Sequence, residues 1–231
     1  MSNLIGIIGA MDIEVNGLVS VMNDKSIDTV SGIDFIRGKI YDKDVVIAKC
    51  GIGKVFAAIC AQAMILKYNP KIIINSGVAG ALSDTLNIMD AVIATSVVQH
   101  DMDTSPLGDP KGLISGINVV YIDTDKEISE KLEKTAKSLN VSAKRGVIAS
   151  GDQFIADQTK KLEIANTFNA MACEMEGASI GHVCYVNNTP FVVMRTISDG
   201  KGEALDYATF AKGAAEQAIE ILKNFLKDCE I

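Results

Sequence analysis

Short apolar runs recur along the whole chain, separated by turns and by stretches with helical periodicity. Many of these runs are rich in β-branched Ile and Val, which pack well on a pleated surface. Continuous apolar runs of this length are typical of strands that are buried on both faces. The predicted strands are 4–8, 35–40, 44–50, 71–75, 91–98, 143–149, 170–173 and 191–197, the second and third forming a hairpin across the polar turn 41–43.

Most of the segments between these strands carry apolar residues at helical spacing. The chain therefore alternates strand and helix, a pattern that predicts an α/β fold with a mainly parallel sheet and helices on both faces. Neither an internal repeat nor a linker divides it, so residues 1–231 are expected to form one domain. The expected helices are 12–22, 55–68, 125–139, 159–168, 177–186 and 207–227.

Acidic side chains and small-residue turns follow several of the predicted strands. In α/β sheets, ligands bind beyond the carboxyl ends of the strands, so these segments predict one binding rim. A polar, glycine-rich segment, 99–118, adds a loop of a length that is usually functional in a compact domain. The segments at strand ends are 11–14, 51–53, 77–80, 151–154, 174–176 and 198–199.

The amino-acid composition limits which ligands such a rim can bind. The chain has 231 residues, of which 48% are hydrophobic, and this is enough for a substantial core. Its formal net charge of −7 argues against a nucleic-acid-binding surface, which is normally basic. A small neutral or cationic molecule is compatible with this charge. We therefore expect a small-molecule ligand and no nucleic-acid partner.

The cysteines are scattered and include no CxxC pair; they are Cys50, Cys60, Cys173, Cys184 and Cys229. This arrangement favours buried thiols in a reducing compartment over a disulfide framework or a zinc site, so no metal is expected. The apolar stretch 4–8 is too short for a signal-peptide core or a membrane span, and no basic region precedes it. We expect a soluble, cytoplasmic protein without a membrane anchor.

Charged residues near strand ends carry the candidate chemistry, and each also has an ordinary structural explanation. Glu14 lies in the first turn of a predicted helix, where an acidic residue stabilises the helix dipole. Glu176 stands two residues after Glu174, so both side chains point the same way from an extended segment. Arg195 inside a buried strand needs an acidic partner, and even spacing places it on the same side as Asp199. A structural ion pair and a catalytic site explain Arg195 about equally well.

Motifs for several other chemistries do not occur in the sequence. The glycine segments 6–9 and 51–54 match neither GxGxxG nor GxxxxGK[ST], which disfavours a dinucleotide or nucleoside triphosphate site. No GxSxG, HExxH or CxxC occurs, which disfavours serine-hydrolase and zinc chemistry. His182, within a predicted helix, is expected to be structural, whereas His100, at the start of the long loop, suits either role.

Seven short segments stand out by their order and spacing: GIIGAMDIEV (6–15), GIGKV (51–55), INSGVAG (74–80), HDMD (100–103), SGDQFI (150–155), EMEGA (174–178) and RTISD (195–199). Together they closely resemble the 5′-methylthioadenosine/S-adenosylhomocysteine nucleosidases of the purine nucleoside phosphorylase superfamily. The resemblance spans essentially the whole chain. No single segment decides it, but the ordered set is specific.

The resemblance implies a nucleoside phosphorylase-like fold, a single-domain three-layer α/β/α arrangement with a mixed, mainly parallel central sheet. It implies hydrolysis of the N-glycosidic bond of 5′-methylthioadenosine and S-adenosylhomocysteine, releasing adenine and a 5-thioribose, without a cofactor and within methionine salvage. Glu14 would then activate water, and Asp199 would protonate adenine N7. Glu176 would bind the ribose hydroxyls, and its charge would favour a cationic sugar, while Arg195 would help to hold the water.

The resemblance also implies a set of substrate-binding residues. Phe154 would stack on adenine, and the backbone of Ile155 would bind the edge of the base. Val78 stands where a Ser is common, and Leu107 stands where an aromatic residue reaches the neighbouring subunit's pocket. These departures bear on the 5′-substituent more than on the reaction. The remaining members of the set are Met11, Ile52, Met175, Ser198 and Tyr207.

Proteins of the same superfamily have other activities, including phosphorolysis and the hydrolysis of other nucleosides. Its phosphorylases carry a phosphate-binding Arg after the first strand, but segment 10–14 has no basic residue and contains Glu14, which favours water as the nucleophile. The resemblance is also compatible with a nucleosidase for futalosine or 5′-deoxyadenosine, and with a non-catalytic nucleoside-binding protein. The family forms homodimers, and the loop 99–118 is the expected contribution to the partner's pocket.

Overall fold

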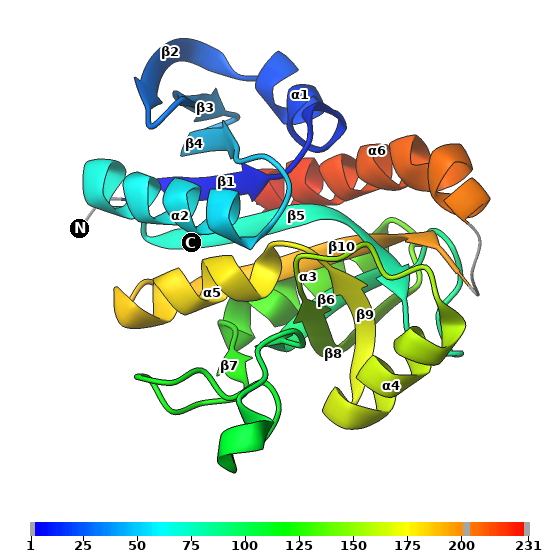
Figure 1. Ribbon diagram of the computed structural model, residues 1–231. Coiled ribbons are helices and arrows are strands. Elements are labelled where there is room, and N and C mark those ends of the chain that lie inside the picture. Colours follow the sequence, from blue (N-terminus) through cyan, green and yellow to red (C-terminus); the bar gives the residue numbers. More distant parts are fainter. Residues whose placement is uncertain (1–2, 201–203, 229–231) are drawn as a thin grey trace.

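The computed structural model describes residues 3–200 and 204–228 and shows an α/β protein built around one mixed sheet (Figure 1). In chain order its elements are β1 (Ile5–Gly9), α1 (Asp12–Ser20), β2 (Asn23–Val30), β3 (Ile33–Ile40), β4 (Lys43–Lys49), α2 (Lys54–Tyr68), β5 (Ile72–Ala81), β6 (Ala91–Gln99), the 3-10 helix η1 (Ser105–Leu107), β7 (Ile122–Asp123), α3 (Lys126–Ser138), β8 (Ala143–Ser150), α4 (Gln158–Phe168), β9 (Ala170–Glu174), α5 (Gly177–Val186), β10 (Phe191–Asp199) and α6 (Ala204–Asp228).

The sheet has the strand order β10-β6-β8-β9-β5-β1-β4-β3-β2, with β7 paired to β6. Strand β10 also pairs with β5, so the strands β5, β10, β6, β8 and β9 close on themselves like a small barrel. The pairings β1–β4, β1–β5, β5–β10, β6–β8 and β8–β9 are parallel. Antiparallel pairing joins β2–β3, β3–β4, β5–β9, β6–β7 and β6–β10.

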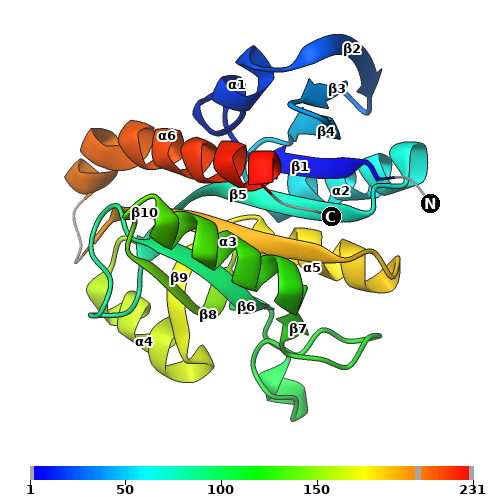
Figure 2. The same cartoon turned by 180° about the vertical axis from the view of Figure 1, so that it is seen from behind.

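Helices cover both faces of the sheet, as the sequence predicts. Helices α2 and α5 pack on the face seen in Figure 1, and α1, α3 and α6 pack on the face seen from behind in Figure 2. Each layer encloses its own apolar core, because alternate strand residues point to opposite faces. The two cores exclude water from the strands that carry the site. The expected three-layer α/β/α fold is thereby confirmed.

The strands of the site end close together. In the parallel pairings β1–β5 and β5–β10, the carboxyl ends lie at the same edge. Strand β9 crosses the end of β5, where Gly80 pairs with Cys173 and Ala81 with Ala172. This crossing places the Glu174–Glu176 segment beside the last residues of β5. The rim expected from the sequence therefore forms where β1, β5, β9 and β10 end.

The sequence prediction missed two strands and misplaced the end of the first helix. Helix α1 ends at Ser20, and β2 begins at Asn23 and pairs with β3. Strand β2 lies at the edge of the sheet and is mostly exposed, so its sequence, NDKSIDTV, lacks an apolar pattern. Strand β7 has only two residues and its pairing with β6 is purely tertiary.

The described residues also bear on the cysteines, on membrane-spanning helices and on metal-binding groups. Cys50, Cys60, Cys173 and Cys184 are free and buried, whereas Cys229 lies outside the described part of the chain. No helix within residues 3–200 and 204–228 is long and apolar enough to cross a membrane. Among these residues no group of three or more His, Cys, Asp or Glu is placed to hold a metal ion.

Candidate active site

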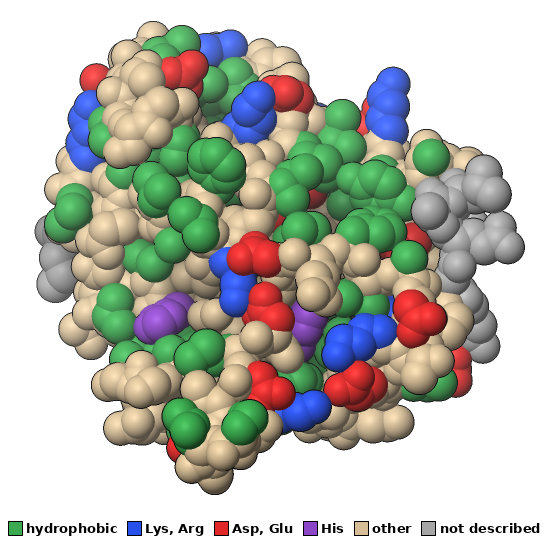
Figure 3. All heavy atoms as spheres, in the orientation of Figure 1, with side chains coloured by type: hydrophobic (Ala, Val, Ile, Leu, Met, Phe, Trp, Pro, Cys, Tyr) green, Lys and Arg blue, Asp and Glu red, His purple; other side chains and the backbone are tan. Residues whose placement is uncertain are grey.

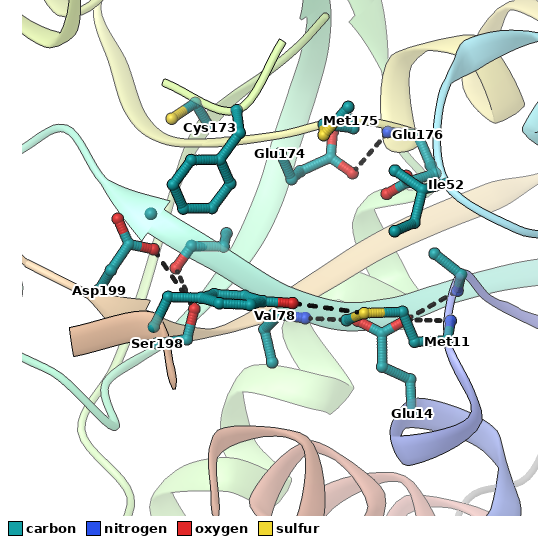
Figure 4. Close-up of a pocket in the computed structure, with 15 residues that line it drawn as sticks. Met11, Glu14, Ile52, Val78, Cys173, Glu174, Met175, Glu176, Ser198 and Asp199 are labelled. Atoms are coloured by element: carbon teal, nitrogen blue, oxygen red, sulfur yellow. Dashed lines mark hydrogen bonds between the residues drawn. The ribbon is translucent and has the colours of Figure 1, made fainter. Parts of the chain in front are cut away.

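A cavity of about 370 Å³ opens at this rim of the sheet (Figure 4). Its wall combines carboxylates with apolar and sulfur-containing side chains. Asp199 lies on one side of it in Figure 4, and Glu14 and Glu176 lie on the other. The lining residues are Ala10, Met11, Glu14, Ile52, Val78, Ala79, Gly80, Phe154, Cys173, Glu174, Met175, Glu176, Ser198, Asp199 and Tyr207.

Glu14 is held at the start of α1 by three backbone N–H groups. One carboxylate oxygen, Oε2, accepts hydrogen bonds from Ala10 N at 2.7 Å and Met11 N at 3.0 Å. The other, Oε1, accepts from Val78 N at 3.0 Å, which ties the carboxylate to β5. A side chain at position 77 would overlap the Glu14 carboxyl group, so Gly77 allows this close approach. A carboxylate has about four lone-pair positions, so one remains for a further donor.

Arg195 lies behind the cavity and is the largest fully buried side chain of the described residues. Its Nη2 donates to Asn75 Oδ1 at 2.6 Å and forms an ion pair with Glu174 Oε2. Glu176 Oε2 lies 3.7 Å from the same nitrogen. Burial alone would lower the pKa of Arg195, but Glu174, Glu176 and Glu14 raise it. The guanidinium is therefore a fixed positive charge.

Glu174, the last residue of β9, completes this ion pair and also binds backbone N–H groups at the start of α5. It accepts hydrogen bonds from the backbone N–H groups of Glu176 and Gly177 and from the hydroxyl of Ser150. Burial alone would raise the pKa of Glu174, but Arg195 and the hydroxyl of Ser150 hold it below its ordinary value. Glu174 is thus an ionised structural carboxylate at a helix N-terminus.

Glu176 has a different environment from Glu174. Its Oε1 accepts one hydrogen bond, from Gly53 N at 2.9 Å. Burial and the neighbouring charge of Glu174 raise the pKa of Glu176 from 4.5 to about 7, although Arg195 lowers it. Glu176 therefore changes charge near neutral pH, while Glu174 stays ionised.

Asp199 lies at the end of β10, across the cavity from Glu14. Its Oδ2 forms an ion pair with Lys161 Nζ at 3.0 Å, and both side chains are almost fully buried. Its Oδ1 lies 3.4 Å from Ser198 Oγ. The absence of a side chain at Gly80 lets β5 approach this carboxyl group, because a Cβ there would lie 2.9 Å from Oδ2.

Aromatic and sulfur-containing side chains form the rest of the wall. The rings of Phe154 and Tyr207 meet edge to face, with centroids 5.4 Å apart and planes at 75°. Tyr207 Oη lies 3.3 Å from Met11 Sδ, which links α6 to the loop after β1. Ile52 and Met175 add apolar surface. Such a wall can hold a flat aromatic ring at one end and a thioether at the other.

Three comparisons with known proteins bear on this site. The family model described as "Phosphorylase superfamily" matches residues 4–227. The 5′-methylthioadenosine/S-adenosylhomocysteine nucleosidase of Staphylococcus haemolyticus is 39% identical over 228 residues, which cover 97% of this chain and 99% of that protein. The chain belongs to this nucleosidase family. Its members are N-glycosyl hydrolases, and the chain is an enzyme of that class.

Solved structures of the family have the same fold. A Helicobacter pylori MTAN mutant with 5′-methylthioadenosine in its active site superposes with a TM-score of 0.94 and 33% identity, covering 99% of this chain and all of that one. The futalosine hydrolase of Helicobacter pylori superposes with a TM-score of 0.93 and 33% identity over 98% of each chain. The nucleosidase fold is thus shared by proteins named for different nucleosides.

The residues predicted from the sequence fall into two groups. Three of them do not line the cavity: Arg195 lies behind it, Ile155 lines a small adjoining cavity, and Leu107 is 84% exposed on η1. The ten that line it are Met11, Glu14, Ile52, Val78, Phe154, Met175, Glu176, Ser198, Asp199 and Tyr207.

Arg195 has the acidic partner that its burial requires. It pairs with Glu174, as the structural explanation predicts, and the pair also lies against the cavity wall. His100 is buried, and burial lowers its pKa, while His182 Nδ1 lies 3.5 Å from Gln99 Nε2. Neither histidine lines the cavity.

Sequence reasoning missed Asn75, Ser150 and Lys161, which hold the charged groups of the site. Asn75 lies in an apolar strand and Ser150 directly follows the predicted strand 143–149, and neither position indicates a partner. Lys161 carried a readable signal. It falls on the buried face of α4 with Ile164 and Phe168, where a cation needs an anionic partner.

The raised pKa of Glu176 predicts a pH-dependent cost to stability. Between pH 4.5 and about pH 7, the carboxyl group of Glu176 is ionised in the unfolded chain but still protonated in the folded protein. Ionisation of Glu176 therefore destabilises the folded state. Glu176→Gln removes that cost. We expect its free energy of unfolding at pH 8 to exceed that of the unsubstituted protein by on the order of 1–3 kcal/mol, with a smaller difference at pH 5. Urea denaturation at both pH values measures this.

The exposed Glu216→Gln on α6 is the matched control and should change the free energy of unfolding by less than about 0.5 kcal/mol at either pH. If Glu176→Gln were equally stable or less stable than the unsubstituted protein at pH 8, the carboxyl group of Glu176 would not be destabilised by its surroundings.

Proposed function

We propose that this enzyme hydrolyses the N-glycosidic bond of 5′-methylthioadenosine and S-adenosylhomocysteine, releasing adenine and a 5-thioribose. The observation that carries the proposal is the placement of Asp199 opposite Glu14 and Glu176 across one cavity (Figure 4). Glycosidic cleavage needs a proton donor for the leaving base on one side and an activated nucleophile on the other. The names of the relatives agree with this substrate class.

Glu14 is proposed to activate the attacking water. Its three backbone N–H donors fix the carboxylate and leave one lone-pair position for a water molecule. None of the described residues that line the cavity is Lys or Arg, and Arg195 is already paired with Glu174. Phosphate would therefore meet carboxylates without a free cation, which supports water as the nucleophile.

Asp199 is proposed to donate a proton to N7 of adenine as the C1′–N9 bond breaks. Negative charge grows on the base at that stage, and a proton at N7 neutralises it. Ser198 lies beside this carboxyl group. Phe154 is proposed to stack on the base, with the backbone of Ile155 binding its edge.

Glu176 is proposed to bind the ribose hydroxyl groups. The carboxylates of Glu14, Glu174 and Glu176 exceed the single positive charge of Arg195, so this side of the cavity favours a cation. A sugar with oxocarbenium character develops such a charge in the transition state. Met175 is proposed to pack against the ribose.

The 5′-substituent is proposed to lie among Met11, Ile52, Val78 and Tyr207. These side chains are apolar or weakly polar, which suits a thioether. Tyr207 approaches Met11 and so narrows this end of the cavity. The activity would serve methionine salvage in the cytoplasm, because adenine and a thioribose are its products.

A homodimer is proposed, with the loop 99–118 of each subunit completing the partner's pocket. Hydrophobic side chains gather over α2 and α5 (Figure 3), and Val55, Ile59 and Leu66 of α2 are exposed. A large exposed apolar face usually marks an interface. Leu107 is highly exposed and outside its own cavity, as a residue that reaches a partner would be.

Futalosine is the second candidate substrate, since a futalosine hydrolase superposes as well as the methylthioadenosine-bound relative does. Both substrates require the same bond cleavage, so the 5′ end of the cavity decides between them. The apolar wall formed by Met11 and Ile52 favours the thioether substrates.

The first test is adenine release from 5′-methylthioadenosine with and without inorganic phosphate. We expect equal rates with and without phosphate and free 5-methylthioribose as the second product, because the described residues that line the cavity include Glu14 and no Lys or Arg. Chromatography of the products measures the two rates and identifies the second product. Strict dependence on phosphate, with a sugar 1-phosphate as product, would contradict hydrolysis, and futalosine cleavage alone would favour the second candidate.

Glu14→Gln tests the proposed base. Gln cannot take a proton from water. Its side-chain NH2 group would also oppose backbone N–H groups that donate to the Glu14 carboxylate in the unsubstituted protein. We expect kcat to fall about 10²- to 10⁴-fold while a nucleoside inhibitor still binds, measured by initial rates and calorimetry. Asp12→Asn, an exposed carboxylate two residues earlier, is the matched control and should keep its activity. Near-native kcat in Glu14→Gln would remove Glu14 from this role.

Ile59→Glu tests the proposed dimer. A charge on the apolar face of α2 has to be desolvated at an interface, so we expect a monomer by analytical ultracentrifugation, with kcat/KM reduced about tenfold or more. Leu162→Glu places the same charge on the exposed face of α4 and should leave both properties unchanged. If the unsubstituted enzyme were a fully active monomer, the proposal of a homodimer would be wrong.

A further inference from the structure

Lys161 is a buried cation at a position where α4 otherwise presents apolar residues. Its exposed fraction is 3%, and Ile164 and Phe168 on the same face of the helix are equally buried. The neighbouring Lys160 is exposed and pairs with Glu163 on the helix surface. A buried ammonium group is costly unless strong acceptors surround it.

The acceptors of Lys161 are both at the end of β10. Its Nζ donates to Asp199 Oδ2 at 3.0 Å and to the carbonyl oxygen of Gly200 at 2.9 Å. The lysine thus reaches the proposed acid from the side of α4. Within the described part of the chain, the side-chain hydrogen bonds of Lys161 go to Asp199 and Gly200, and Lys161 itself does not line the cavity.

Stability alone does not account for this pair. Replacing a buried ion pair by apolar residues is often neutral or stabilising, because desolvation of two charges offsets their attraction. The face of α4 around Lys161 is apolar, so an apolar side chain would suit it. The positive charge of Lys161 acts on Asp199, a carboxyl group of the cavity wall.

We propose that Lys161 is a positioning residue for Asp199 in the glycosidic cleavage. This rests on the proposed function, in which Asp199 protonates the leaving base. Lys161 holds Oδ2, which fixes the carboxyl plane, and among residues 3–200 and 204–228 no cation pairs with Oδ1. Its charge also stabilises the carboxylate that remains after the proton has left.

The bond changes explain why a cation helps at this point. Asp199 takes up a proton before this step and enters it protonated. The electron pair of the C1′–N9 bond then moves to the base, the O–H bond of Asp199 breaks and an N7–H bond forms, while the water adds to C1′ and gives its proton to Glu14. Asp199 becomes negative in this step, and the Lys161 ammonium group lies 3.0 Å from its Oδ2. A preorganised charge beside a group that ionises in the transition state lowers the barrier.

The leaving group distinguishes this role from a purely structural one. Adenine needs a proton at N7, whereas 4-nitrophenolate leaves without one. For Lys161→Met we expect kcat with 5′-methylthioadenosine to fall about 10- to 100-fold, with KM changed less than about threefold. With 4-nitrophenyl 5-methylthioriboside, kcat should change less than about threefold. Lys161→Arg should recover part of the loss.

Lys160→Met is the matched control, because it removes the adjacent exposed lysine and should leave both rates unchanged. Asp199→Asn should show the same dependence on the leaving group as Lys161→Met, and the double variant should be no slower than Asp199→Asn alone. If Lys161→Met does not fold, Lys161→Gln makes the same test, since it keeps a hydrogen-bond donor without the charge.

Equal losses on both substrates, or a double variant in which the two losses multiply, would overturn the inference about Lys161. So would an unchanged kcat for Lys161→Met alongside an impaired Asp199→Asn, a result that leaves Asp199 as the acid. Full activity of Asp199→Asn with 5′-methylthioadenosine would instead contradict the proposed function.

Discussion

The buried ion pair between Arg195 and Glu174 is the interaction on which the site depends. It joins β10 to β9, and the contact of Arg195 with Asn75 adds β5, so three strands are held by one guanidinium. Removing either charge would leave the other unpaired in the interior, which is far more costly than removing both. The positions of Glu176 and Glu14 follow from this arrangement, because their segments pack around the same group.

Placing several carboxylates around one guanidinium gives neighbouring residues different properties. Glu174 receives the cation, two backbone N–H groups and a hydroxyl, and stays ionised. Glu176, two residues later, receives one backbone N–H group, and its pKa lies at about 7. The excess of negative charge costs folding free energy, and the same excess suits a cationic sugar. Under the role proposed for Glu176, function and stability are thus opposed at this residue.

Sequence patterns predicted most of the fold because long apolar runs and helical periodicity are local properties. They failed at β2, whose exposed polar residues become a strand only by pairing with β3. They also failed at β7, which is too short to have a pattern. In the site, Glu14, Glu176 and Asp199 stood out as candidates because they follow strands, and the resemblance supplied their expected roles. Lys161 was missed although its place among apolar positions of α4 indicates a buried cation, and its partner could not be identified because it is 38 residues away in the chain.

By itself, the sequence determined the alternation of strands and helices, the carboxylates that follow the strand ends and the resemblance to the nucleosidases. These depend on residue type and spacing along the chain. Only the tertiary structure decided that Arg195 pairs with Glu174 behind the cavity, that three backbone N–H groups bind Glu14, and that Lys161 meets Asp199. Such contacts join segments far apart in the chain, and their energies depend on burial, which spacing does not encode.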